Sequence, residues 1–239
     1  MERKKILRFI FIALILFSAY HLTKNLKDKR DFESGQQTAR TIKERLPVTV
    51  VDPREEEKET FRRLQEKIPP LVAWLTIPGT AIDFPVVQAN DNRYYLTHDY
   101  KGKENRYGAP FLDKDNDPRF TDQNSIIYGH DDPDDRVFGS LRKLKELKNR
   151  GKAPVMELLT EHGKETYRIR CVYVVGADDN FRSVCYDAET WDIFTRRWEE
   201  KNLLKEPKPR REDQLLTLQT CDGNVNRLVI HGVRETSEL

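Results

Sequence analysis

The stretch "TLQTCDGNVNRLVIHG", residues 217–232, sets a cysteine between two apolar runs. Side chains of an extended strand alternate between its two faces, so Cys221 shares a face with Leu215, Thr217 and Gln219, whereas Leu216, Leu218 and Thr220 lie on the other. The turn-forming residues 222–226 follow, and a second apolar run begins at Arg227. The pattern predicts a β-hairpin with Cys221 at the end of its first strand, on the more polar face.

The same hairpin predicts which residue lies beside the thiol. If the two strands pair, Cys221 and Arg227 face each other across the open end, with Cβ atoms about 5 Å apart. Arg234 would lie about 23 Å further along the second strand, at about 3.3 Å per residue. A guanidinium beside a thiol stabilises a thiolate or a developing oxyanion, which a cysteine that only packs does not require. The geometry therefore indicates a nucleophile, Cys221, with Arg227 as its partner.

A nucleophilic cysteine also needs a base, and the chain has five histidines. His21 lies in an apolar N-terminal run, His162 in a turn, and His231 in mid-strand, where a packed or exposed strand residue is expected. His98 in "YYLTHDY" and His130 in "SIIYGHDD" remain as candidates. His130 is favoured because it directly follows an apolar strand, after a glycine that permits a sharp turn and before two acidic residues. His98 stays the alternative.

Composition limits the classes of function. The 42 lysines and arginines nearly balance the 40 aspartates and glutamates, so the net charge of +2 gives no electrostatic footprint for nucleic acid. The three cysteines have no CxxC spacing, so they predict neither a disulfide framework nor a zinc site. The 239 residues allow one large domain with an appendage.

The N-terminal segment is expected to be that appendage. Residues 1–22 place basic residues before an apolar run from Phe9 to Leu22, which predicts an uncleaved signal-anchor helix with a cytoplasmic tip and the rest of the chain outside. A cleaved signal peptide is the alternative, but no small-x-small cleavage site follows the run. Residues 23–67 predict a charged stalk ending in a helix, with its charges in solvent.

Residues 68–239 change to short β-branched and aromatic runs separated by turn formers. Eight runs are strand candidates: "VAWLTIPG", "IDFPVVQ", "APFLD", "SIIYGH", "PVMELLT", "TYRIRCVYVVG", "LLTLQTC" and "RLVIHGV". Helices are expected over residues 137–149 and 187–204. A mainly β fold, a closed and mostly antiparallel barrel with a few helices, accounts for this pattern better than alternating βα units.

Several of these segments together resemble one enzyme family. "TLQTC" followed by "RLVIHG", and "SIIYGH" followed by "VFGSL", resemble the motifs of sortases, the membrane-anchored cysteine transpeptidases of Gram-positive bacteria. "VAWLTIPGTAIDFPVVQ", "NRYYLTHDY" and "GAPFLD" resemble class B sortases in particular. The resemblance covers residues 71–233. It implies an eight-stranded sortase barrel over 68–239 and a catalytic set of His130, Cys221 and Arg227.

The resemblance also implies substrates and partners. Substrate contacts are expected at Asn92, Leu96, Tyr128 and Thr220. Cys221 would cleave an NPxTN- or LPxTG-like sorting signal of a surface protein after its threonine, through a thioacyl intermediate. The acceptor would be an amine of a cell-wall peptide, in a stem, a cross-bridge or lipid II. The enzyme would be a single-pass protein of the cell membrane with its catalytic domain on the extracellular face, and the chemistry needs no metal or cofactor.

Three alternatives remain at this point. The barrel could be a catalytically degenerate, sortase-like binding module in which Cys221 is inert. It could be a sortase that polymerises pilins and does not anchor proteins to the wall. A papain-like peptidase is disfavoured, because the cysteine of that class normally opens a helix near the start of the domain, whereas Cys221 ends a strand near the C-terminus.

Overall fold

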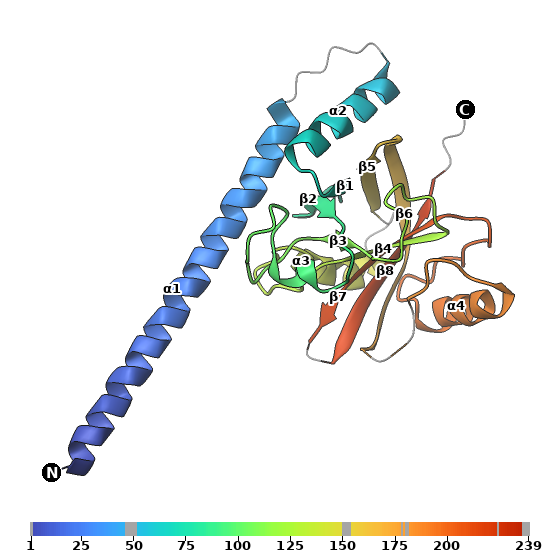
Figure 1. Cartoon of the computed structure of the whole chain (residues 1–239). Helices are drawn as coiled ribbons and strands as arrows, with labels where there is room; N and C mark the ends of the chain where they lie inside the picture. The colour runs from blue at the N-terminus through green and yellow to red at the C-terminus, as the bar shows by residue number, and fades with distance from the viewer. Residues whose placement is uncertain are drawn as a thin grey trace.

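Eight strands close into a barrel in the computed structural model, which describes residues 2–45, 52–149, 154–177, 179, 182–223 and 225–235 (Figure 1). The strands are β1 (Leu71–Thr76), β2 (Asp83–Val87), β3 (Phe111–Leu112), β4 (Asn124–Tyr128), β5 (Val155–Thr160), β6 (Gly163–Gly176), β7 (Leu215–Asp222) and β8 (Asn226–Arg234). Their order around the barrel is β1-β2-β3-β4-β7-β8-β6-β5. The predicted closed and mostly antiparallel barrel is confirmed; β2 with β3 and β4 with β7 are the parallel pairs.

Helices precede the barrel and fill the connections between its strands. They are α1 (Glu2–Arg45), α2 (Pro53–Lys67), α3 (Tyr94–Thr97), the 3-10 helix η1 (Gly139–Asn149) and α4 (Ala188–Lys201). The Asp187 carboxylate accepts a hydrogen bond from the Thr190 amide at 2.8 Å and caps α4, which lies within the helix expected over 187–204. The helix expected over 137–149 is present as η1, but its geometry is 3-10.

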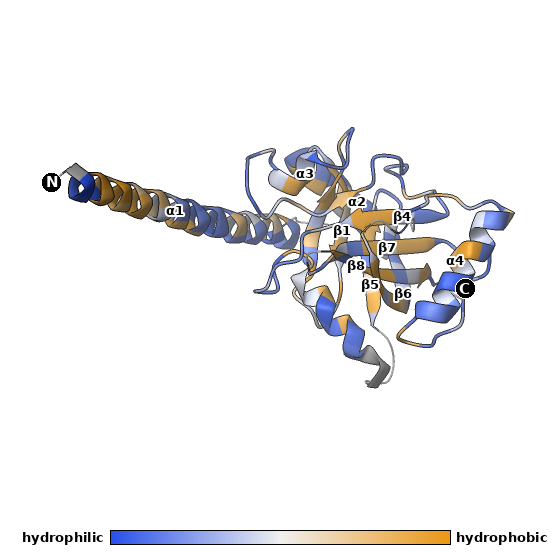
Figure 2. Cartoon of the chain, turned by 90° about the horizontal axis from the view of Figure 1, so that it is seen from below, coloured by the Kyte–Doolittle hydropathy of each residue, from blue (hydrophilic) through white to orange (hydrophobic). Residues whose placement is uncertain are grey.

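Helix α1 is one unbroken helix of 44 residues. Its N-terminal half projects away from the barrel and is hydrophobic (Figure 2). An 18-residue window in it has a mean hydropathy of 1.9 and is not buried in the protein, so by length and composition this half could cross a membrane. The predicted boundary between residues 22 and 23 falls inside this helix with no break in the backbone.

The second half of α1 packs on the barrel. Phe32 and Ala39 are buried there, and the Lys43 ammonium lies 3.0 Å from the Asp83 carboxylate at the start of β2. Asp83 also accepts a hydrogen bond from the Trp74 indole at 2.7 Å. The charges of this stretch are predicted to lie in solvent, whereas Lys43 and its neighbours hold the helix against the barrel.

Strand β7 is buried on both of its faces. Leu216 and Leu218 point into the barrel, where they join the main hydrophobic core. The opposite face, which the sequence predicts to be the more polar one, is covered because Trp198 and the other aromatic residues of α4 pack over Leu215 and Val229. Only the last two residues of the strand, Cys221 and Asp222, are partly exposed. The fold therefore brings the predicted nucleophile out of the core at the tip of a buried strand.

Candidate active site

The hairpin of β7 and β8 pairs Cys221 with Arg227, as the sequence predicts. The ladder continues by one more pair, Asp222 with Asn226, so the turn is shorter than the predicted five residues. Both Cys221 and Arg227 are partly exposed. The Arg227 guanidinium donates a hydrogen bond to the Asn226 carbonyl at 2.9 Å, which holds its side chain beside the turn.

The parallel pairing of β4 with β7 brings His130 to the same place. Tyr128 pairs with Gln219, and the Gly129 amide donates to the Gln219 carbonyl at 3.2 Å, which extends the ladder past the end of β4. His130 comes two residues after Tyr128, and Cys221 comes two residues after Gln219. Residues two apart along a strand share a face, so the register brings His130, Cys221 and Arg227 together at the ends of three neighbouring strands.

His130 is held by its ring and by its backbone. Its Nε2 donates to the Leu96 carbonyl at 2.7 Å. Because a carbonyl only accepts, Nε2 carries a hydrogen in this bond, and Nδ1 is the atom of the neutral ring that can take a proton. The His130 carbonyl accepts from the Phe138 amide at 3.0 Å. The Phe138 ring lies so close to Gly129 that a Cβ there would meet it at 2.6 Å, so only glycine fits before the histidine.

His98, the alternative base, has a different setting. It is the C-terminal cap of α3, where its ring stacks on Tyr94 with the ring centres 4.1 Å apart. Its Nδ1 lies 2.9 Å from the Tyr94 carbonyl oxygen. These contacts tie the ring to its own short helix, whereas the strand register brings His130 to Cys221. The geometry supports His130 over His98.

Helix η1 supplies positive charge to the acidic residues that follow the histidine and the cysteine. Asp131 forms an ion pair with Arg142, and the Asp222 carboxylate lies 2.8 Å from the Lys145 ammonium. Burial raises the pKa of Asp131, the Arg142 guanidinium opposes that rise, and the nearby Asp222 carboxylate adds to it. Sequence reasoning did not identify Arg142 and Lys145. The pattern that could have identified them is their spacing of three residues, which places both side chains on one side of a 3-10 helix.

Two of the predicted substrate-contacting residues meet at one carboxylate. The Tyr128 hydroxyl donates to Asp113 Oδ2 at 2.5 Å, and the Asn92 amide donates to the same oxygen at 3.0 Å. Burial raises the pKa of Tyr128, and the Asp113 carboxylate adds to the rise, so the phenol stays protonated. Asp113 itself is buried. It is the last residue of the segment "GAPFLD", but sequence reasoning gave it no role. Asn92 and Tyr128 are thus joined in one polar cluster beside β4.

The other two predicted contacts differ from each other. Leu96 is partly exposed, and its carbonyl is the group that holds the His130 ring. Thr220 is buried and alternates with Cys221, so its side chain lies on the face of Leu218, inside the barrel. Within the described part of the chain, the Thr220 hydroxyl has no hydrogen-bond partner. Substrate contact at these four positions stays a prediction.

His231 lies on the same face of the hairpin as Cys221, but it is fully buried. Its Nε2 lies 2.9 Å from the Tyr173 hydroxyl and its Nδ1 lies 2.7 Å from the Thr217 hydroxyl. The Thr217 hydroxyl in turn donates to the Asn124 side chain at 2.6 Å, and the Trp198 ring stacks on the imidazole. Burial lowers the pKa of His231 to about 3, so the ring is neutral at ordinary pH. Of the two expected settings, a packed or an exposed strand residue, the structure has the packed one.

The three cysteines are free thiols in different surroundings. Cys171 is buried in β6, and burial raises the pKa of its thiol, which keeps it protonated. Cys185 is exposed in the connection before α4, and Cys221 is partly exposed. The register also pairs Cys171 with His231, but both are fully buried, whereas Cys221 is the partly exposed thiol that it brings beside a histidine and an arginine.

A closed barrel with a cysteine between a histidine and an arginine at adjacent strand ends has the groups that a cysteine transpeptidase needs. The sortase-domain family model matches residues 75–235, and the chain therefore belongs to the sortase family. It is 29% identical over 236 residues to sortase B of Listeria monocytogenes, with 95% of each chain covered. The family is one of cysteine transpeptidases, which excludes the papain-like alternative.

Solved structures agree with the class B resemblance. Sortase B of Bacillus anthracis, in complex with AAEK1, superposes with a TM-score of 0.75 at 30% identity, covering 87% of this chain and 98% of that one. A Staphylococcus aureus sortase B–substrate complex gives a TM-score of 0.74 at 20% identity, covering 90% of this chain and all of that one. At 20% identity, the similarity to the Staphylococcus aureus structure supports the fold alone.

Proposed function

We propose that this chain is an active class B sortase that cleaves an NPxTN- or LPxTG-like sorting signal after its threonine and transfers the protein to a cell-wall amine. The observation that carries the proposal is the register that joins β4, β7 and β8, with His130, Cys221 and Arg227 at their adjacent ends. A module that only binds a peptide does not require a thiol between an imidazole and a guanidinium.

The reaction is built from the roles that these three groups can take. As the Cys221 sulfur attacks the threonine carbonyl carbon, His130 takes the thiol proton; the peptide C–N bond then breaks and His130 gives that proton to the departing amine. The threonine is then held as a thioester on Cys221. An incoming amine attacks this thioester, and His130 takes the amine's proton and passes it to the sulfur as the C–S bond breaks and the Cys221 thiol is released. The Arg227 guanidinium stabilises the negative charge that develops on the carbonyl oxygen in both steps.

The same chemistry defines the partners. The donor would be a surface protein with a C-terminal sorting signal, and the acceptor a peptidoglycan stem or cross-bridge amine, or lipid II. The exposed apolar half of α1 supports a single membrane span, with the barrel on the extracellular side. Wall anchoring is favoured over pilin polymerisation, because the relatives that this chain resembles are class B sortases.

Mass spectrometry tests donor and acceptor together. The detergent-solubilised chain is incubated with a panel of sorting peptides and candidate amines, and the masses of the products and of the acyl-enzyme are measured. We expect a thioester on Cys221 and a new amide bond between the threonine and one amine. The Cys221→Ala variant, which keeps the barrel, is expected to form neither. Turnover by that variant would refute the assignment, and a folded wild type with no product from any pair would favour the degenerate binding module.

Selective thiol labelling separates the same two alternatives at lower cost. A methanethiosulfonate reagent should modify Cys221 faster than the more exposed Cys185, because the strand register brings an imidazole and a guanidinium beside Cys221. Buried Cys171 serves as the unreactive reference. Equal rates at Cys221 and Cys185 would point to an inert thiol.

A further inference from the structure

The strand register defines two ends of the barrel. Val87, at the end of β2, pairs with Phe111, and Phe111 pairs with Tyr128 at the end of β4, so all three lie at the end where His130 is found. Strand β2 begins at Asp83, which therefore lies toward the opposite end. The end with His130, Cys221 and Arg227 is the catalytic end of the barrel, and the end with Asp83 is its far end.

Helix α1 runs along the barrel from the far end to the catalytic end. Near its C-terminus, Lys43 is paired with Asp83 at the far end. Ten residues earlier, Glu33 lies 3.3 Å from Arg136, which belongs to the segment between His130 and η1. Moving toward the N-terminus of α1 therefore means moving toward the catalytic end.

The contacts continue up to the start of the apolar half. The Lys103 ammonium lies 2.7 Å from the Asp31 carboxylate, and the Arg106 guanidinium donates to the Asn25 side chain at 2.9 Å. Just beyond Asn25, Leu22 is the last residue of the apolar run and is exposed. At a rise of about 1.5 Å per residue, Leu22 lies only about 5 Å along the helix from Asn25 and about 16 Å from Glu33.

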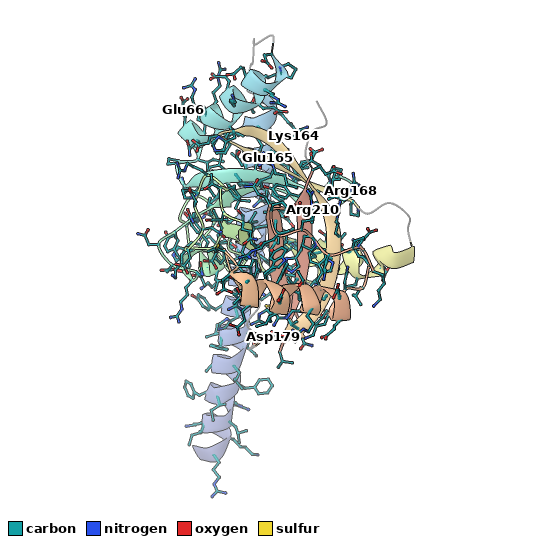
Figure 3. All side chains as sticks on the ribbon, turned by 90° about the vertical axis from the view of Figure 1, so that its right-hand side faces the viewer. Glu66, Lys164, Glu165, Arg168, Asp179 and Arg210 are labelled. Atoms are coloured by element: carbon teal, nitrogen blue, oxygen red, sulfur yellow. The ribbon has the colours of Figure 1, made fainter. Side chains whose placement is uncertain are left out.

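Two views agree on this direction. In Figure 1 the turn between β7 and β8 lies at the lower edge of the barrel, toward which α1 runs out to its N-terminus. In Figure 3 Asp179, which follows the β6 end paired with Asn226, lies at the lower edge of the barrel, and the free half of α1 extends further in that direction. Lys164, at the turn between β5 and β6, lies at the opposite edge.

We propose that the catalytic end of the barrel faces the lipid surface and that the docked half of α1 is a rigid mount that holds it there. The inference rests on the membrane span of the proposed function and adds an orientation to it. A helix continuous through the span and the docked half cannot let the barrel swing freely, because its contacts extend from Lys43 down to Asn25. The partner of this surface is the lipid bilayer, and substrates would enter the site from the membrane side.

Fluorescence quenching in lipid vesicles tests the orientation. The full chain, with Cys221→Ala and Cys185→Ser to leave only buried Cys171, receives one labelling cysteine, either Val225→Cys at the β7–β8 turn or Lys164→Cys at the far end. Each labelled chain is reconstituted into vesicles whose headgroups carry a nitroxide quencher. We expect several-fold stronger quenching at position 225 than at position 164. Equal quenching, or stronger quenching at position 164, would overturn the orientation.

A matched pair of insertions tests the rigid mount. Seven helix-forming residues added after Leu22 lengthen the helix by about 10.5 Å and should reduce quenching at position 225. Seven glycine and serine residues at the same site give a flexible connection of equal length and should not reproduce that reduction in full. Unchanged quenching with the helical insertion would refute the mount.

Two further readouts separate this inference from the proposed catalytic function. A chain that does not float with the vesicles would overturn the membrane orientation, while cleavage of a sorting peptide by the wild-type chain in detergent would leave the enzyme assignment standing. Conversely, the expected quenching pattern, together with a wild-type chain that never cleaves any sorting peptide, would support the orientation and count against the catalytic proposal.

Discussion

Two regions of the β7–β8 hairpin carry polar side chains on the same face, and their environments are opposite. In the middle of the hairpin, Thr217 and His231 are buried beneath α4, and both imidazole nitrogens have hydroxyl partners. At its tip, Cys221 and Arg227 emerge from the core and are partly exposed. One strand register therefore leads from a buried polar network to the partly exposed candidate active site within four residues.

The difference shows what makes a histidine structural or reactive. His231 has both nitrogens bonded inside the core, so taking up a proton would cost both burial and hydrogen bonding. His130 is fixed through one nitrogen, by the Leu96 carbonyl, and its other nitrogen can exchange a proton with a substrate. The residue type is the same, and the number of hydrogen-bonded ring nitrogens fits the structural role of His231 and the catalytic role that we propose for His130.

Replacing His130 should have the largest effect. His130→Gln removes the proton-transfer group, so kcat/KM for a sorting peptide should fall by about 10²- to 10⁴-fold, the usual contribution of a general acid–base group. His98→Gln is the matched control and should keep most of the activity, because His98 caps α3 and stacks on Tyr94. Steady-state kinetics on the two variants decides whether His130 or His98 is the base. If the His98 variant loses activity and the His130 variant does not, the assignment of the base is wrong.

Replacing Arg227 should have the next largest effect. Arg227→Lys keeps the charge but loses the two-pronged donor, so kcat should fall by about 10²-fold while the barrel stays folded. Arg234→Lys, on the same strand but at the far end, where Arg234 pairs with Glu165, is the control and should change kcat little. Equal kcat for the Arg227 variant and the wild type would show that the guanidinium does not hold the substrate oxygen.

His231 should make the stability of the fold depend on pH. Its pKa is about 3 in the folded chain and about 6.5 when unfolded, so between these values the unfolded state binds a proton that the folded state does not. Above pH 6.5 the ring is neutral in both the folded and the unfolded state, so protonation costs the fold nothing. The free energy of unfolding decreases as the pH falls from about 6.5 toward 3. At about 1.4 kcal/mol per pKa unit, the full loss is roughly 4 to 5 kcal/mol.

Thermal unfolding of the detergent-solubilised chain between pH 7 and pH 4 measures this loss. His231→Gln should be less stable at pH 7, because two hydroxyls lose their imidazole partner, but its stability should fall less steeply with pH. His162→Gln, at an exposed turn, is the control and should keep the wild-type pH dependence. An unchanged pH dependence in the His231 variant would assign the acid sensitivity to other groups.

The smallest effect is expected at η1. Lys145→Met leaves the Asp222 carboxylate without its ammonium partner next to Cys221, so an uncompensated negative charge opposes the charge that develops on the sulfur as it reacts. The pair is partly exposed, so we expect the alkylation rate of Cys221 by iodoacetamide to fall only about two- to five-fold. Lys143→Met, on the same helix but paired with Asp135, is the control and should react at the wild-type rate. Equal rates for both variants would show that Asp222 has no electrostatic influence on the thiol.

The local part of the site can be predicted from the sequence because it depends on one hairpin. Alternation along β7 and a connection rich in turn-forming residues are enough to pair Cys221 with Arg227, and the register confirms that pair. The predicted turn is too long, because Asp222 and Asn226 have turn-forming side chains and yet form the last ladder pair. The eight-stranded barrel is also predictable, from short strands together with the family resemblance.

The long-range part cannot be predicted from local patterns. Nothing in the alternation of β4 indicates that it lies parallel to β7, which is the pairing that brings His130 to Cys221. Burial of the polar face of β7 depends on α4, and the docking of α1 depends on Asp83, far away in sequence. Likewise, the positions of Lys145 and Arg142 become meaningful only when η1 is packed beside the strand ends. Such contacts depend on strand order and packing, which residue spacing does not determine.

The parallel pairing of β4 with β7 also has a consequence for biosynthesis. The two strands are about 90 residues apart in the chain, and one lies in the middle of the barrel sequence while the other belongs to its last hairpin. Pairing such distant segments requires closing a long connection, which costs conformational entropy and slows folding. The ribosome also synthesises His130 well before Cys221, because His130 comes earlier in the chain. The two side chains meet only when the barrel closes. A nascent chain that lacks the last hairpin has no Cys221 to accept an acyl group from a sorting signal. Formation of the acyl-enzyme would therefore require the completed barrel.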